Sequence, residues 1–261
     1  MPLLDHLIEL RSRLMWSLAS IIVLFVAIFP FAEYVYQFLV QPLADIFEEM
    51  GGQRRLIFTA LHEAFFTYIK LSLISALFIA FPFISMQFWM FVAPGLYKHE
   101  KKALAPFLIA TPVLFFMGAA MVYFIVMPWA YEFLLAFELE GGPGTLPIVS
   151  EPKVNEYLSL SINLIFAFGI CFELPVVLTL LGRIGVISSK GMKEKRKYAI
   201  LISFIVAAVI TPPDVISQVM LASVLIFLYE ISIFSVRLIE KDRGQPEDDD
   251  TEERADAMSG A

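Results

Sequence analysis

Six long stretches with almost no charge constrain the fold more than any other feature of the sequence. They measure 16 to 29 residues between bracketing charges, and two of them contain a single carboxylate, Glu173 or Glu230. A helix needs about 20 apolar residues to cross a hydrocarbon core of about 30 Å. Lipid offers no hydrogen-bond partner to the backbone, so helices are the structures that satisfy such segments. The sequence therefore predicts six transmembrane helices.

We predict an all-α integral membrane protein with one membrane domain over residues 1–240. The expected spans cover approximately 14–32, 71–93, 103–127, 157–181, 198–211 and 215–236. The fifth span is short, since the residues from Tyr198 to Ile210 would form a helix of only about 20 Å, and we expect the bilayer to thin there. Prolines in or beside the spans predict kinked helices; they are Pro82, Pro106, Pro112, Pro128 and Pro175.

Composition agrees with a membrane protein and excludes several other classes. Hydrophobic residues make up 59% of the chain, and much of the net charge of −7 comes from acidic residues after Glu240. We expect residues 241–261 to be a disordered acidic tail that does not indicate a nucleic-acid partner. The one cysteine and the three scattered histidines match no metal or haem spacing, so we expect no cofactor and no metal.

The basic residues lie mostly on one side of the predicted membrane domain. Fifteen of the 19 Lys and Arg residues fall in the N-terminal segment, the connections after spans 2 and 4, and the C-terminal segment. Cytoplasmic segments are enriched in Lys and Arg. We therefore predict that both termini are cytoplasmic. On the other side we expect short amphipathic helices within 33–63, a plain loop at 138–155, and a tight turn at 211–214.

Two carboxylates fall beside apolar residues at the predicted inner face. Glu9 lies in a segment whose leucines Leu7, Leu10 and Leu14 share one helical stripe, which predicts an amphipathic helix on the inner surface. Glu100 lies in the next inner connection. Either carboxylate alone has an ordinary explanation: Glu9 as the i,i+4 partner of Arg13, and Glu100 as a solvated loop residue. Together they could each hold a guanidinium group through charge-assisted hydrogen bonds.

Glu173 lies well inside the fourth span. A carboxylate at such depth costs about 2.5–3.5 kcal/mol on insertion scales, so it must face protein or water. A functional role and a packing role, through a hydrogen bond to a neighbouring helix, are both open. Glu230 raises the same question nearer the inner face.

Five segments together match the motifs of one family. They are His6–Leu14, Phe58-Thr59 with Glu63–Phe66 and Lys70, Phe91–Lys102, Phe168–Pro175, and Thr211–Gln218. They resemble the TatC family, the multispanning core subunit of the twin-arginine protein translocase. The resemblance extends from residue 3 to about residue 240 and includes all six spans.

The resemblance implies a non-enzymatic receptor in the bacterial cytoplasmic (inner) membrane that binds twin-arginine signal peptides of folded precursors. It would assemble single-span TatA/TatB-type subunits, form a homo-oligomer within the complex, and be driven by the proton-motive force. The implied signal-peptide residues are Glu9, Leu10, Arg11, Phe91, Pro94 and Glu100. The implied partner contacts are Glu173, Pro42, Asp214 and Gln218.

Two other functions compete with this hypothesis. A proton-coupled secondary transporter of a small solute would use Glu173, but the inverted repeats typical of such proteins are absent between spans 1–3 and 4–6. An intramembrane enzyme would need a nucleophile with a base, or a metal set. The spans contain no histidine and no paired aspartates, which argues against an enzyme.

Overall fold

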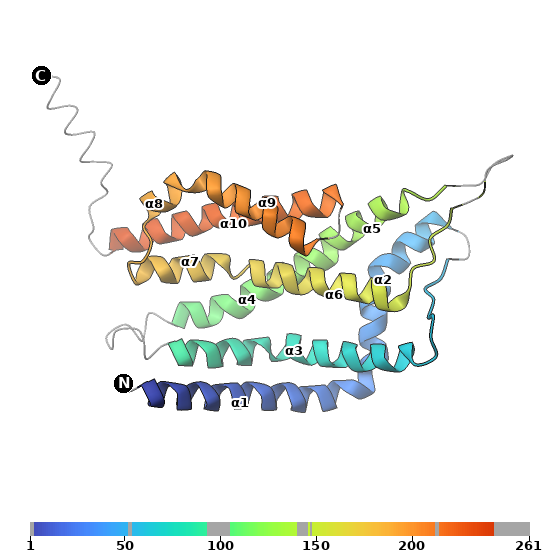
Figure 1. The fold of residues 1–261 in the computed structure, drawn as a ribbon, viewed down its shortest axis with the longest axis horizontal. Coiled ribbons are helices and arrows are strands. Elements are labelled where there is room, and N and C mark those ends of the chain that lie inside the picture. The colour runs from blue at the N-terminus through green and yellow to red at the C-terminus, as the bar shows by residue number, and fades with distance from the viewer. Residues whose placement is uncertain are drawn as a thin grey trace, which may run out of the picture.

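The computed structural model describes residues 3–51, 54–92, 105–139, 146, 148–211 and 214–242. Helices account for nearly all of this part, and β structure is limited to two isolated bridges. Figure 1 shows long helices lying side by side, with α2 crossing one end. The helices are α1 (Leu3–Ile28), η1 (Phe29–Phe31), α2 (Ala32–Met50), α3 (Glu63–Val92), α4 (Ala105–Met121), η4 (Val122–Val126), α5 (Met127–Leu135), α6 (Val154–Cys171), α7 (Leu174–Arg183), α8 (Ser189–Glu194), α9 (Arg196–Ile210) and α10 (Val215–Asp242).

Within the described part of the chain, five helical segments are long and apolar enough to cross a membrane. They are Leu4–Met50, Glu63–Val92, Pro106–Leu135, Val154–Arg183 and Val215–Lys241. The predicted short fifth span corresponds to α9, which has 15 residues and a length of about 22 Å. It packs along α10, and neither α9 nor the start of α10 extends as far as α2 at that end of the bundle (Figure 1).

The amphipathic lead-in does not form a separate surface helix. It is the first part of α1, which runs for 26 residues without a break, or about 39 Å. This exceeds a hydrocarbon core of about 30 Å. The lead-in is therefore a direct extension of the first span, because neither proline nor glycine interrupts the sequence from Leu3 to Ile28.

The segment after span 1 forms one 19-residue helix, α2, where several short helices were expected. Pro42 lies inside α2, yet the helix continues through it. Proline removes the N–H that would bond to the carbonyl four residues earlier, here that of Phe38. The Tyr123 hydroxyl donates to that oxygen at 2.7 Å, so a tertiary contact satisfies the carbonyl that Pro42 leaves without its helical partner.

Spans 3 and 4 are both interrupted where proline occurs. In span 3 the π-helical turn η4 precedes Pro128 at the start of α5. In span 4, α6 ends at Cys171 and α7 begins at Leu174 with Pro175 in its first turn. Proline in a helix interior clashes with the preceding turn, and a π-turn is one way to relieve the clash. Pro82 and Pro112 lie inside α3 and α4, which continue through them.

Two glycines bring α4 and α6 close together. A Cβ atom on Gly118 would lie 2.7 Å from the Phe168 carbonyl oxygen, and one on Gly169 would lie 2.6 Å from the Phe115 ring. Small residues at such crossings let the backbones of membrane helices approach. The buried core is continuous around this crossing and includes Phe168 and Phe172.

The two ends of the bundle differ. The start of α1, the end of α7, α8 and the end of α10 lie together in Figure 1, and we call this the basic end. Its described cations are Arg11, Arg13, Arg183, Lys190, Lys193, Lys195, Arg196, Lys197, Arg237 and Lys241. The opposite end, which we call the cap end, contains α2, the starts of α3 and α6, and the end of α5.

Candidate functional site

Arg13 connects the start of α1 to α3 at the basic end. Its guanidinium donates to Gln87 Oε1 at 3.2 Å and to Glu9 Oε1 at 3.4 Å. Gln87 is 6% exposed on α3, so it provides a fixed anchor 74 residues away along the chain. The arrangement holds the Glu9 carboxylate on a defined face of α1.

A shallow groove of about 410 Å³ surrounds Glu9. Asp5 and Ile8 line it together with Ser12, Arg13 and Trp16. Asp5 and Glu9 are one helical turn apart, so their carboxylates lie on the same side of α1. Sequence reasoning missed Asp5, although its i,i+4 spacing from Glu9 is readable in the sequence. A groove with two carboxylates beside apolar residues is suited to one peptide that has cationic residues next to apolar ones.

The other implied signal-peptide residues are placed only in part. The Phe91 ring stacks on the His6 ring, with centroids 4.3 Å apart and planes 17° from parallel. This contact brings the end of α3 against the lead-in. Leu10 and Arg11 are exposed on α1. Pro94 and Glu100 lie outside the described residues.

The ordinary explanation of Glu9, an ion pair with Arg13, is present in the structure. Side-chain exposures of 32% for Arg13 and 24% for Glu9 make it a partly solvated pair, and pairs near the surface contribute about 0–1 kcal/mol. So weak a pair leaves the carboxylate available to a second cation. The pair and a binding role are therefore compatible.

Glu173 terminates a line of polar side chains across the helices. It precedes α7, at the break in span 4. Its Oε1 is buried and has no hydrogen-bond partner among the described residues, while the Thr111 hydroxyl faces its carboxyl group. Trp89 Nε1 donates to Thr111 Oγ1 at 3.0 Å. The line thus runs from α3 through α4 to the fourth span.

The remaining implied partner residues lie apart from one another. Pro42 is buried in α2 at the cap end. Asp214 is 5% exposed, and its Oδ1 accepts from the Ser217 N–H at 2.7 Å, so it caps the start of α10. Gln218 follows on α10, and its N–H donates to the Asp214 carbonyl oxygen at 3.3 Å. The structure gives Asp214 a clear role in beginning the last helix.

Glu230 has a partner at the basic end. Its Oε2 lies 2.6 Å from the guanidinium of Arg196 at the start of α9. This ion pair joins α9 to α10 and supplies the packing explanation for the carboxylate. Within the described ranges no group of three or more His, Cys, Asp or Glu residues is arranged to hold a metal ion.

An apolar groove of about 410 Å³ lies among α2, α3, α4 with η4, and α6. Its walls include Phe38, Phe78, Tyr123 and Phe166. Sequence reasoning did not find it, because its residues come from four separate segments and each looks like ordinary core. No local signal in the sequence distinguishes them.

Comparisons with known proteins agree with the fold and with the sequence motifs. The family profile described as Sec-independent protein translocase protein (TatC) matches residues 5–223. A Sec-independent protein translocase protein TatC of Magnetococcus marinus is 50% identical over 246 residues, which cover 94% of this chain and 88% of that protein. The protein of the same name from Rickettsia prowazekii is 42% identical over 239 residues, covering 92% and 94%.

A solved structure is similar over nearly its whole length. The crystal structure of a twin-arginine translocase receptor, TatC, superimposes with a TM-score of 0.74 at 40% identity, covering 90% of this chain and 99% of that one. The relatives are named as translocase components, which is a role in protein transport. The profile match, the identities and the shared fold lead to one conclusion. The chain belongs to the TatC family of Sec-independent protein translocase proteins.

Proposed function

We propose that this protein is the receptor subunit of a twin-arginine export system in the bacterial cytoplasmic membrane. It binds signal peptides with paired arginines and assembles single-span TatA/TatB-type subunits around them. The observation that carries the proposal is the Glu9 carboxylate, held on α1 by the Arg13–Gln87 contact and lining a groove with Asp5. The similar receptor structure supports it independently.

In this proposal the chain crosses the membrane six times, with α9 as the short fifth crossing. The basic end faces the cytoplasm, since its described segments hold ten cations and cytoplasmic segments are enriched in Lys and Arg. The first turns of α1 and the last turns of α10 then lie on the cytoplasmic side. At about 22 Å, α9 is shorter than a core of about 30 Å, so the bilayer thins beside it.

Recognition rests on the planar geometry of the guanidinium group. Arg13 contacts Glu9 through Oε1. Each carboxylate oxygen has two acceptor sites, so Oε2 and the remaining site on Oε1 can both accept from an incoming arginine. Two parallel N–H···O bonds are available to arginine and not to lysine. Glu100 would receive the second arginine, while Leu10, Arg11, Phe91 and Pro94 would support the signal peptide around the two charges.

Docking at the basic end would start assembly within the membrane. The apolar segment of the signal peptide inserts beside the kinked helices, and single-span subunits contact Glu173, Pro42, Asp214 and Gln218. The complex contains several copies of this chain and uses the proton-motive force to pass the folded precursor. No bond chemistry by this chain and no cofactor are required.

A second function, proton-coupled transport of a small solute, is favoured by one observation. Glu173 has a buried oxygen without a hydrogen-bond partner among the described residues, as expected of an intramembrane proton site. Solute uptake into liposomes containing this chain alone would support the transporter. Uptake that requires a signal peptide would not.

Photocrosslinking of a twin-arginine precursor to this chain in membrane vesicles tests the receptor proposal. Glu9→Gln should lower crosslinking about tenfold, which corresponds to about 1.4 kcal/mol of lost binding. Glu48→Gln is the matched control, because Glu48 is an exposed carboxylate near the end of α2, far from Glu9. A twin-lysine precursor should bind the unchanged protein about as weakly.

Equal crosslinking of the twin-arginine and twin-lysine precursors at every salt concentration would end the receptor proposal. Unchanged crosslinking in a Glu9→Gln/Glu100→Gln double variant would end the assignment of these carboxylates. Membrane levels of each variant, measured by immunoblotting, separate loss of binding from loss of protein.

A further inference from the structure

We propose that the seam between α3 and α6 at the cap end binds one phospholipid with a zwitterionic phosphoethanolamine headgroup. The headgroup would occupy a polar pocket at the start of the two helices. An acyl chain would occupy the apolar groove farther along the same helices. The site lies at the opposite end of the bundle from Glu9.

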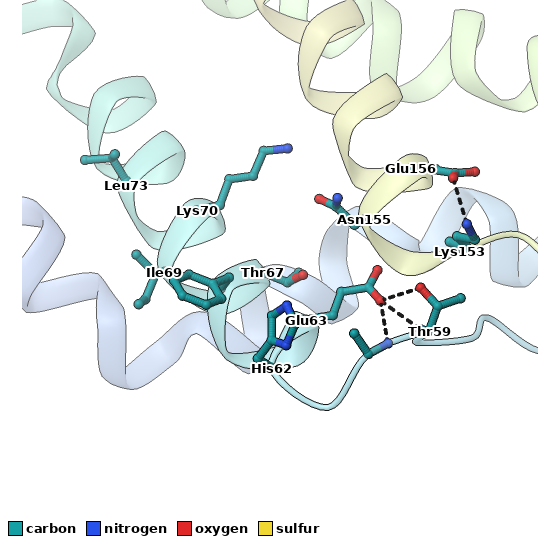
Figure 2. Close-up of a pocket in the computed structure, with 12 residues that line it drawn as sticks. Thr59, His62, Glu63, Thr67, Ile69, Lys70, Leu73, Lys153, Asn155 and Glu156 are labelled. Atoms are coloured by element: carbon teal, nitrogen blue, oxygen red, sulfur yellow. Dashed lines mark hydrogen bonds and ion pairs between the residues drawn. The ribbon is translucent and has the colours of Figure 1, made fainter.

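The polar pocket has a volume of about 610 Å³ and is lined from both helices. Figure 2 shows Glu63 and Lys70 on α3, with Asn155 and Glu156 on α6 across from them. The connection before α3 closes the pocket below, because Glu63 Oε2 accepts from the Thr59 N–H at 2.8 Å and the Thr59 hydroxyl at 3.1 Å. These bonds make the wall a formed surface of folded residues.

Lys70 provides the phosphate-binding charge. Its Nζ extends across the seam and donates to Ser159 Oγ at 2.7 Å. Among the described residues it forms no ion pair. An ammonium group carries three donors, so Lys70 can bond to a phosphate while it keeps Ser159. The ammonium group of a snorkelling lysine would hydrogen-bond to water, whereas that of Lys70 is directed between two helices.

The other charges of the pocket balance one another, which favours a zwitterion over an anion. Lys70 and Lys153 are accompanied by Glu63 and Glu156, and Lys153 Nζ lies 3.4 Å from Glu156 Oε1. A net anionic headgroup would add negative charge to this balanced pocket, whereas a zwitterion adds none. The ammonium of phosphoethanolamine would lie near those carboxylates while its phosphate reaches Lys70.

The apolar groove continues the same helix faces toward the middle of the membrane. On α3 the pocket residue Lys70 is followed one turn later by Ile74, and then by Phe78, in the groove. On α6 Ser159 is followed by Ile162 and Phe166 in the groove. Residues three or four apart share a helix face. A polar pocket beside an apolar groove matches the headgroup and the acyl chain of a phospholipid.

Native mass spectrometry of the full chain in detergent, titrated with palmitoyl-oleoyl phosphatidylethanolamine, tests the proposal. The unchanged protein should retain one lipid, and Lys70→Gln should weaken binding about tenfold, while Lys70→Arg retains it. Arg55→Gln is the control, since it removes one cation from the same end at a site that pairs with Glu151 instead. Phosphatidylglycerol with identical chains and soluble O-phosphoethanolamine form the two comparison arms.

Equal binding of phosphatidylethanolamine by Lys70→Gln and Arg55→Gln would overturn the site. Equal binding of phosphatidylglycerol would overturn the zwitterionic assignment, and equal binding of soluble phosphoethanolamine would overturn the role of the groove. Should Lys70→Gln fail to fold by circular dichroism, Ser75→Trp tests the same site from the groove. Ser75 lines the groove, so the added ring should displace the lipid, and undiminished binding would contradict the proposal.

Discussion

The hydroxyl of Tyr123 donates a 2.7 Å hydrogen bond to the carbonyl oxygen of Phe38, the group that Pro42 leaves without its helical partner. The two rings also stack, with centroids 4.4 Å apart and planes within 2°. Tyr123 belongs to the π-turn η4 of the third span, and Phe38 belongs to α2. Two local irregularities far apart in sequence thus compensate one another.

Tyr123→Phe should destabilise the protein by about 1 kcal/mol, because interhelical hydrogen bonds in membranes average about 0.6 and reach about 1.7 kcal/mol. In a Pro42→Ala background the same change should cost much less, since the restored N–H of residue 42 can bond to Phe38. Thermal unfolding in detergent of the four proteins of this cycle measures the coupling. Purely additive effects would refute the compensation.

Breaking the ion pair between Arg54 and Glu138 should cost far more stability than breaking the nearby pair Arg55–Glu151. Its atoms are 2.6 Å apart with side chains 17% and 13% exposed, and Glu138 also accepts from the Ser150 N–H at 2.9 Å. Glu138→Gln should cost about 3 kcal/mol, as expected when a buried cation loses its partner. Replacing both residues by methionine should cost less than this single change.

The pair Arg55–Glu151 is the internal control for that prediction. Its atoms are 3.3 Å apart and its side chains are 73% and 51% exposed, so Glu151→Gln should cost about 1 kcal/mol or less. Chemical unfolding of both variants in the same detergent gives the comparison. Similar losses at Glu138 and Glu151 would mean that burial does not strengthen the first pair.

Gly118→Ala should disturb the crossing of α4 and α6. The new Cβ would lie 2.7 Å from a backbone oxygen of Phe168, which cannot move aside as a flexible side chain would. We expect a loss of about 1–3 kcal/mol, typical of overpacking, measured by thermal unfolding. Val113→Ile adds one carbon on an exposed face of the same helix and should be nearly neutral; equal losses in the two variants would contradict the close crossing.

Thr111→Val tests the line of polar side chains that ends at Glu173, because it should destabilise the protein. The substitution removes the acceptor for Trp89 Nε1, and leaving a buried donor unsatisfied costs about 1–3 kcal/mol. Thr111→Ser keeps the hydroxyl and should retain stability. Trp89 fluorescence, recorded with Trp16 and Trp129 replaced by phenylalanine, should change in Thr111→Val only; an unchanged spectrum would count against the contact.

The sequence predicts the long helices well because the spacing of charges fixes where lipid can surround the chain. Prolines 128 and 175 likewise predict the interruptions of spans 3 and 4. The continuity of α2 could not be predicted, since it depends on Tyr123, which lies 85 residues from its acceptor. Proline inside a helix usually kinks or breaks it. The helix continues through Pro42 because a tertiary contact satisfies the Phe38 carbonyl.

For the candidate site, local spacing identifies the Glu9–Arg13 pair, but not the Gln87 anchor that fixes it. Hydrogen bonds between distant segments leave no periodic signal in one sequence. The same holds for the line from Trp89 to Glu173 and for the apolar groove, whose walls come from four segments. Residue type and depth suggested Glu173, whereas its neighbours required the fold.

The corner at Phe29–Phe31 has a mechanical consequence. One short 3-10 turn joins α1 to α2 without a loop. The direction of one helix is therefore coupled to the direction of the other. α1 packs mainly against α3, whereas α2 also contacts α5. A tilt of the first turns of α1 would therefore also displace α2 at the cap end of the bundle.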